Sequence, residues 1–340
     1  MVSIKDISAA CGVSVATVSK ALNNQKDVSD ATKARIKEVA KQMGYVPNSA
    51  SRSLKIKRTY NLGIVYDEVS GRGLTHDFFA QVLDAFKHYA ENHGYDITFV
   101  NNNPHGSDKM TYLEKCRYRN FDGVMIACSE YENKQIQEVI DSEIPSVCID
   151  YSKEGKSSVM SDNAGGMRQL VDYAVSRGYK RISYIHGEDT PVTKERKAAF
   201  LSETKKLGID VPSEYIREGK YRDTISSEKI TYELLELNET PECIMYPDDY
   251  AALGGVNALM HRGINIYNGI EVIGYDGILY KKGLPARITS VIQDTETIGE
   301  TAARLLLQNI KEPGFSEKVV VEGKLIEHKN IELMMGAKLP

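Results

Sequence analysis

The sequence predicts an all-α head followed by an α/β body of two doubly wound parallel-sheet lobes. Two observations carry this prediction. Residues 1–60 combine serine helix caps with apolar residues at helical spacing. From Asn61 onward, short apolar strands alternate with helical segments, which is typical of βαβ units. The body is long enough for two such lobes.

The head is predicted to contain three short helices. Each starts after a serine that can cap it, Ser3, Ser14 or Ser29, and Gly12 and Gly44 end the first and third. The expected inner faces are Ile4, Ile7 and Ala10; Val18 and Leu22; and Ile36, Val39, Ala40 and Met43. Two helices joined by a tight glycine-containing turn and supported by a third form a helix-turn-helix.

The second of these helices has the pattern of a recognition helix. Its outer N-terminal residues Val15, Ala16 and Thr17 are short and are followed by Ser19 and Lys20. Short side chains let a helix enter the major groove deeply, where apolar groups contact thymine methyls and a lysine reaches guanine or phosphate. A small three-helix domain for protein contacts is the alternative interpretation.

Charge is divided unequally along the chain. Residues 1–60 contain 11 basic and 4 acidic side chains, a formal charge of +7, whereas the other 280 residues carry 32 basic and 43 acidic ones, a charge of −11. A basic head on an acidic body suits a head that binds a polyanion. Chance clustering on a solvated face is the alternative.

The head resembles a known family. The run SIKDISAACGVSVATVSKALNN from Ser3 to Asn24 resembles the N-terminal signature of LacI/GalR repressors, and MGYVPNSASRSLK from Met43 to Lys55 resembles their hinge. The Val-Ala pair is the variant of galactose-type and catabolite-control-type members. The resemblance implies a DNA-binding set of Ser3, Ser14, Val15, Ala16, Thr17, Ser19, Lys20, Asn23, Asn48, Ser51, Arg52, Leu54 and Lys55.

The hinge also follows from backbone chemistry. Pro47 stops the third helix and Asn48 can cap a segment that is too short to be a stable helix alone. The resemblance implies that paired hinges form helices in the operator minor groove, where Leu54 wedges between base pairs. Ser51 stands where the family usually has alanine, which leaves the packing between hinges open.

The body is expected to bind a ligand at the carboxyl ends of its strands. The expected strands are Leu62–Tyr66, Ile97–Val100, Gly123–Ala127, Ser146–Ile149, Ile182–Ile185, Cys243–Tyr246 and Val272–Tyr275, and the expected helices include Asp77–His93, Ala164–Arg177, Lys194–Leu207 and Tyr250–Arg262. Polar residues follow these strands repeatedly. Paired donors and acceptors beside an aromatic ring suit a sugar.

The body resembles the periplasmic-binding-protein-like type I core of the same family, on the landmarks SDNAGGM, ERKAAF, PDDYAALG and VIGYD. The candidate effector-binding residues from the strand ends and the resemblance are Asp67, His76, Phe79, Asp162, Arg196, Tyr221, Asp249 and Gln293. Helix capping alone is the alternative for Asp162 and Asp249, and a local ion pair is the alternative for Arg196. His76, His186 and Tyr221 have ordinary surface or core roles as alternatives.

We therefore expect a homodimeric, cytoplasmic and nucleoid-associated repressor that binds a pseudo-palindromic operator and is controlled by a carbohydrate-like effector. Alternatives are a catabolite-control type regulator with a phosphoprotein co-regulator, and a solute-binding protein. No common hydrolase, nucleotide-binding or metal motif is present, the start lacks a secretory pattern, and no apolar run is long enough to span a membrane, so no enzyme, cofactor, metal or membrane role is expected.

The expected domains are a DNA-binding domain at 1–46, a hinge and linker at 47–60, and an effector-binding and dimerisation domain at 61–340. Within the last, the resemblance places the N-lobe at about 61–161 and 291–322 and the C-lobe at about 162–290 and 323–340. Five widely spaced cysteines, an odd number without a C-x-x-C pair, are expected to be buried free thiols.

Overall fold

A computed structural model describes residues 2–46, 58–67, 73–101, 110–265, 269–282 and 288–327. The chain divides into two compact units, Met1–Thr59 and Tyr60–Pro340. The hinge residues Asn48, Ser51, Arg52, Leu54 and Lys55 lie outside the described residues.

The head contains α1 (Ile4–Cys11), α2 (Val15–Leu22) and α3 (Asp30–Gln42), as predicted. Ser3 and Asp6 form a reciprocal capping box, and Ser14 and Ser29 cap the other two helices. Their core is Ile7, Cys11, Val18, Ala21, Val28, Ile36 and Ala40. The prediction was wrong for Ala10, which is exposed, because the helical turn directs its neighbour Cys11 inward instead.

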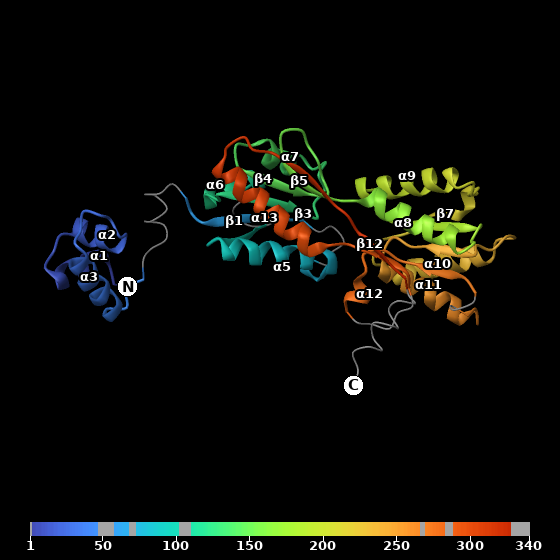
Figure 1. Cartoon of the computed structure of the whole chain (residues 1–340), viewed down its shortest axis with the longest axis horizontal. Coiled ribbons are helices and arrows are strands. Elements are labelled where there is room, and N and C mark those ends of the chain that lie inside the picture. Colours follow the sequence, from blue (N-terminus) through green and yellow to red (C-terminus); the bar gives the residue numbers. More distant parts are fainter. Residues whose placement is uncertain are drawn as a thin grey trace. The chain divides into compact units, whose positions relative to one another are not determined.

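The first sheet of the body has six parallel strands in the order β11-β5-β4-β3-β1-β2. Figure 1 labels β1, β3, β4 and β5 of this sheet. Its strands are β1 (Asn61–Tyr66), β2 (Asp96–Val100), β3 (Gly123–Ala127), β4 (Ser146–Ile149), β5 (Ser157–Ser161) and β11 (Lys318–Val321). Residues of β3, β4 and β5 are buried along their whole length, as in a sheet covered on both faces.

Helices cover both faces of this first sheet. The helices α5 (Asp77–Asn92) and α13 (Thr295–Lys311) pack together over one apolar cluster. The short helix η1 (Gly73–Thr75) comes just before α5 in the chain. A second cluster contains residues of α6 (Tyr112–Arg119) and α7 (Lys134–Asp141). Because α13 and β11 follow the elements of the second sheet in the sequence, the first lobe is formed by two separate segments of the chain.

The second sheet has four parallel strands in the order β7-β6-β8-β9. The strands are β6 (Ile182–His186), β7 (Ile216–Glu218), β8 (Cys243–Met245) and β9 (Glu271–Ile273). The helices around it are α8 (Asn163–Ser176), α9 (Pro191–Lys206), α10 (Thr224–Leu235), α11 (Asp249–His261) and α12 (Ile278–Lys281), with η2 (Ser213–Tyr215) before β7. Separate apolar clusters under α8 and α9 and under α10 and α11 show that this sheet is doubly wound too.

The chain passes between the lobes three times. It passes first from β5 into α8, next from β10 (Ser290–Ile292) into α13, and last from β11 into β12 (Lys324–Ile326). β10 and β12 pair antiparallel, and the bridges Ile273–Thr289 and Asp276–Ile292 attach the β10 segment to the second sheet. The observed architecture confirms the predicted fold class.

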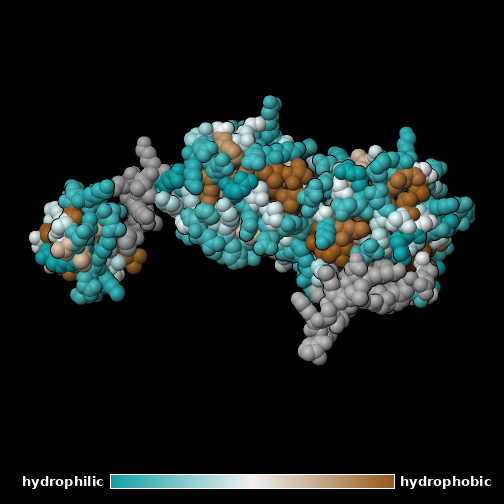
Figure 2. Space-filling model, in the orientation of Figure 1, coloured by the Kyte–Doolittle hydropathy of each residue, from teal (hydrophilic) through white to brown (hydrophobic). Residues whose placement is uncertain are grey.

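Polar and apolar side chains are interspersed on the face of the body that Figure 2 shows, with separate brown patches among teal ones. Within the described part of the chain, no helix combines the length and the hydropathy of a membrane-spanning segment. The five cysteines are free, and Cys128 alone is only partly buried.

Replacing Gly166 by alanine should destabilise the body. A Cβ atom there would lie 2.1 Å from the hydroxyl oxygen of Tyr275, so α8 and this ring would have to separate. Overpacking of this kind costs about 1–3 kcal/mol. Thermal unfolding should show a lower melting temperature for Gly166→Ala, and the added change Tyr275→Phe should recover part of it. An unchanged melting temperature would show that α8 is not held against Tyr275.

Candidate functional site

The outer face of α2 is the candidate DNA-reading surface of the head. Val15 is 44% exposed and Ala16 is exposed, whereas Val18 and Ala21 on the inner face are fully buried in the head core. Ser14 accepts the backbone N–H of Thr17 at 3.1 Å and thereby fixes the start of the helix. The helix therefore presents two short apolar side chains to solvent from a rigid support.

The polar residues of this surface have local partners in the free head. Lys20 pairs with Asp27 in the segment between α2 and α3, and the side-chain amide of Asn23 donates to the carbonyl of Ser19 at 2.6 Å. Lys20 and Asp27 are both about half exposed, and exposed ion pairs contribute little to stability. A phosphate or a base can therefore replace Asp27 at Lys20 at small cost.

In the body, Arg196 is the centre of a polar cluster between the lobes. It lies on α9 and is only 3% exposed. Its Nε donates to Asn163 Oδ1 at 2.9 Å, Nη1 donates to the carbonyl of Pro247 at 3.1 Å, and Nη2 lies 3.9 Å from Asp276 Oδ1. The guanidinium also stacks 3.5 Å from the ring centroid of Tyr275. Its partners come from three separate loops at the strand ends.

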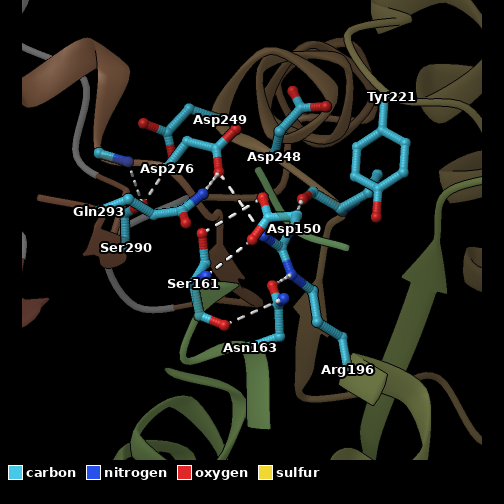
Figure 3. Close-up of polar contacts among 12 residues, drawn as sticks. Asp150, Ser161, Asn163, Arg196, Tyr221, Asp248, Asp249, Asp276, Ser290 and Gln293 are labelled. Carbon is cyan, nitrogen blue, oxygen red and sulfur yellow. Dashed lines mark hydrogen bonds and ion pairs between the residues drawn. The ribbon is translucent and has the colours of Figure 1, made fainter. Parts of the chain in front are cut away.

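The cluster extends from Arg196 in two directions (Figure 3). On one side, Asn163 donates to the carbonyl of Ser161 at 3.3 Å, and the N–H of Ser161 donates to Asp150 at 2.7 Å. On the other, Gln293 Nε2 donates to Asp276 Oδ1 at 2.6 Å, while Gln293 Oε1 is buried and has no hydrogen-bond partner in the described part of the chain. The cluster thus joins the first crossover between the lobes to the second.

Two adjacent aspartates at the start of α11 have different surroundings. Asp248 accepts the backbone N–H groups of Ala251 and Arg222, and burial raises the pKa of its carboxyl to about 6. Asp249 accepts from the Ser290 hydroxyl at 2.7 Å and the Leu279 N–H at 3.2 Å. Burial raises the pKa of Asp249 to about 8.

Tyr221 lies beside the Arg196 cluster. Its ring packs so closely on Gly187 that a Cβ atom there would lie 2.1 Å from the ring, and its hydroxyl shares a hydrogen bond of 2.8 Å with Thr193. Burial raises the pKa of the Tyr221 hydroxyl. This glycine–tyrosine contact holds an aromatic ring at the strand ends.

The structure brings Arg196, Tyr221 and Gln293 together, and it gives other candidates local roles. Asp162 caps α8 through the N–H of Gly165, so its neighbour Asn163 is the residue that contacts Arg196. Asp67 is exposed, and its side chain forms a hydrogen bond with the side chain of Tyr112. The rings of His76 and Phe79 pack together at the start of α5, 5.0 Å apart.

The sequence prediction omitted several members of this cluster from its list of sites: Asp150, Ser161, Asn163, Asp248 and Asp276. Asp150 and Asp276 have positive φ angles of 54° and 86°, which non-glycine residues rarely adopt. Such strain concentrates at functional sites, but it leaves no signal in a single sequence. Position directly after a predicted strand was the signal that could have selected both residues.

A hollow lies next to this cluster. It has a volume of about 790 Å³, extends along α5, α12, α13 and the crossover strands β10 and β12, and shares Gln293 with the cluster. Among the residues that the structure describes, no group of three or more His, Cys, Asp or Glu is arranged to hold a metal ion.

Asp249→Asn should reduce the pH dependence of stability. Because burial raises the pKa of this carboxyl from 3.8 to about 8 in the folded protein, its contribution is complete below the unfolded pKa and is lost as the pH rises toward 8. Relative to the wild type, the melting temperature of Asp249→Asn should therefore increase between about pH 5 and pH 8. Asp30→Asn, at a carboxylate that is 99% exposed, is the control. A constant difference between Asp249→Asn and wild type would contradict the assignment.

Comparison with known proteins agrees with both units. Residues 3–48 match the family described as bacterial regulatory proteins of the lacI family, and residues 171–329 match a periplasmic binding protein-like domain. The transcriptional repressor PurR of Mannheimia succiniciproducens is 27% identical over 98% of this chain and 99% of its own length. The probable transcriptional repressor ExuR of Bacillus subtilis is 28% identical over 95% of this chain and 96% of its own.

Solved structures agree with the fold. The lac repressor dimer bound to operator and the anti-inducer ONPF has a TM-score of 0.81 and 21% identity, and covers 96% of this chain and 98% of that chain. A complex of the transcriptional regulator CelR with cellobiose has a TM-score of 0.67 and 24% identity over the same shares. The names of both curated relatives describe repressors of transcription. A helix-turn-helix head, a doubly wound two-lobed body and these matches show that the chain belongs to the LacI family of DNA-binding transcriptional regulators.

Proposed function

We propose that this protein is a homodimeric repressor that binds a pseudo-palindromic operator through α2. A small carbohydrate-like effector lowers or raises its affinity for the operator. The observation that carries the proposal is the polar cluster around Arg196, which joins two of the three crossovers between the lobes. A ligand held there acts on the segments about which the lobes can turn.

The head supports the DNA-binding half of the proposal. Val15 and Ala16 supply apolar contacts for thymine methyls, and Lys20 supplies a cation for guanine or phosphate. A dimer places two such helices on two half-sites of an operator, so the symmetry of the operator follows the symmetry of the protein. The lac repressor, which shares this fold, is a dimer on its operator.

The body supports the effector-binding half. Asp248, Asp276 and Gln293 offer acceptors and donors for hydroxyl groups, and Tyr221 offers a ring for the C–H face of a sugar. The unpartnered Oε1 of Gln293 is an acceptor that a ligand hydroxyl can satisfy. CelR, a regulator of similar fold, binds cellobiose.

The domain assignment remains part of the proposal: residues 1–46 read DNA, 47–60 form the hinge, and 61–340 bind the effector and dimerise. The hinge role of Leu54 and its neighbours is carried by the resemblance alone. In such an arrangement the effector changes the spacing of the two hinges. It can shift the equilibrium between the two conformations of the dimer only by the difference in its affinity for them. The protein would act in the cytoplasm, at the chromosome.

Ala16→Leu should weaken operator binding. A longer side chain on the outer face of α2 would hold the helix away from the base edges, whereas it would leave the buried face of the head unchanged. With an operator selected from a random duplex pool, fluorescence anisotropy should show a loss of roughly 10-fold or more. Ala34→Leu, at an exposed alanine of α3, should retain wild-type affinity. Equal losses in both variants would remove α2 as the reading helix.

Arg196→Lys should abolish the effector response while operator binding persists. Lysine keeps the charge but lacks the planar guanidinium that donates to Asn163 and Pro247 from separate nitrogens while it stacks on Tyr275. A thermal-shift screen with sugars, sugar acids and sugar phosphates first identifies a ligand of the wild type. Operator anisotropy is then measured with that ligand. A normal response in the variant would place the effector elsewhere.

A further inference from the structure

A second arginine near this cluster has unused hydrogen-bond donors. Arg222 lies between β7 and α10, and its side chain is only 10% exposed. Its Nη2 contacts Asp77 Oδ2 at 3.0 Å and the carbonyl of Thr75 at 3.2 Å. Its Nε and Nη1 are buried and have no hydrogen-bond partner among the residues that the structure describes. Since a buried charged donor without an acceptor is costly, these two groups indicate a missing acceptor.

Arg222 shares its carboxylate partner with a second cation. The carboxylate of Asp77 is shared between Arg222 at 3.0 Å and Lys282 at 2.6 Å, and it also accepts from the Tyr250 hydroxyl at 3.0 Å. The ring of Tyr250 lies 4.7 Å from the Arg222 guanidinium and 5.5 Å from Lys282 Nζ. One carboxylate thus serves two cations, and none of these contacts reaches Nε or Nη1 of Arg222.

This positive group adjoins the proposed effector site. Arg222 directly follows Tyr221, and its backbone N–H donates to Asp248 at 2.5 Å. The backbone of Arg222 has a φ of 57°, a strained conformation for a non-glycine residue, and its side chain reaches Asp77 of the other lobe. Arg196, in contrast, has acceptors at Asn163 and Pro247 and lies near Asp276. The unpartnered buried donors therefore lie at Arg222, whose carboxylate partner also binds Lys282.

We propose that the effector is an anionic carbohydrate, whose acid group binds Arg222 with Lys282 beside it while its hydroxyl groups face Asp248 and Gln293. This inference rests on the proposed function and specifies the ligand class of the same site. A sugar carboxylate supplies oxygen acceptors for the two unpartnered donors of Arg222, and a sugar phosphate presents the same kind of acceptor. Because Asp77 comes from α5 of the other lobe, the acid group competes with it and couples ligand binding to the contact between lobes.

The test compares acids with their neutral parents by isothermal titration of the full chain at constant ionic strength. Galacturonate and glucuronate are set against galactose and glucose, glucose 6-phosphate separates phosphate from carboxylate, and acetate and inorganic phosphate report simple anion binding. We expect one of the sugar acids or the sugar phosphate to bind at least roughly 10-fold more tightly than its neutral parent, since hydrogen bonds to charged groups are the strong ones.

Two substitutions separate a ligand role of Arg222 from a purely structural one. Arg222→Gln should reduce affinity for the acid roughly 10- to 100-fold, and Asp77→Asn should maintain or increase it, because the competing carboxylate is gone. If Arg222 served only to hold the lobes together through Asp77, both substitutions would change affinity in the same direction. Arg262→Gln is the matched control, since Arg262 also stacks on a tyrosine and pairs with a glutamate, 2.6 Å away.

Three outcomes would overturn the inference: neutral sugars that bind as tightly as their acids, unchanged acid affinity in Arg222→Gln, or no binding by any acid or phosphate of the panel. Each is distinct from failure of the proposed function. A neutral sugar that binds and alters operator affinity would leave the repressor assignment intact, whereas a protein that selects no operator from a duplex pool would remove it.

Discussion

The buried guanidinium of Arg196 is the constraint on which the effector half of this protein depends. An arginine cannot lose its charge in a protein, and taking a charge out of water is costly unless partners surround it. The chain supplies those partners from the amide of Asn163, the carbonyl of Pro247 and the ring of Tyr275. Satisfying one cation therefore fixes three strand-end loops relative to α9.

That constraint also determines where a ligand can act. Asn163 begins α8 just after the first crossover, and Gln293 follows the second. The third crossover is held from α8 as well, because Gln169 donates to the carbonyl of Gly323 at 3.0 Å and accepts the N–H of Leu325 at 3.0 Å. All three passages between the lobes are thus tied to the cluster or to the helix that borders it. A ligand that rearranges the cluster changes the relation between the lobes.

The fold could be predicted because its signals are local. Serine caps and glycine ends marked the head helices, and buried apolar runs such as Gly123–Ala127 marked strands without further context. The residues of the site were harder to predict from the sequence. The sequence selected Arg196 and Gln293, which both lie in the cluster, and Asp162, whose neighbour Asn163 contacts Arg196. It also selected Asp249, which accepts hydrogen bonds from Ser290 and Leu279, whereas Asp276 lies 3.9 Å from Arg196. Which of two neighbours turns inward depends on backbone angles, including left-handed ones, that a pattern of residue types does not specify.

In the function proposed above, effector binding in the body and operator binding by the head are energetically coupled. The coupling is measured in both directions. Operator affinity is determined with and without a saturating effector, and effector affinity with and without operator. Linkage requires the two affinity ratios to be equal. We expect equal ratios that differ from one. An effector that binds in the body while operator affinity stays the same would contradict the account.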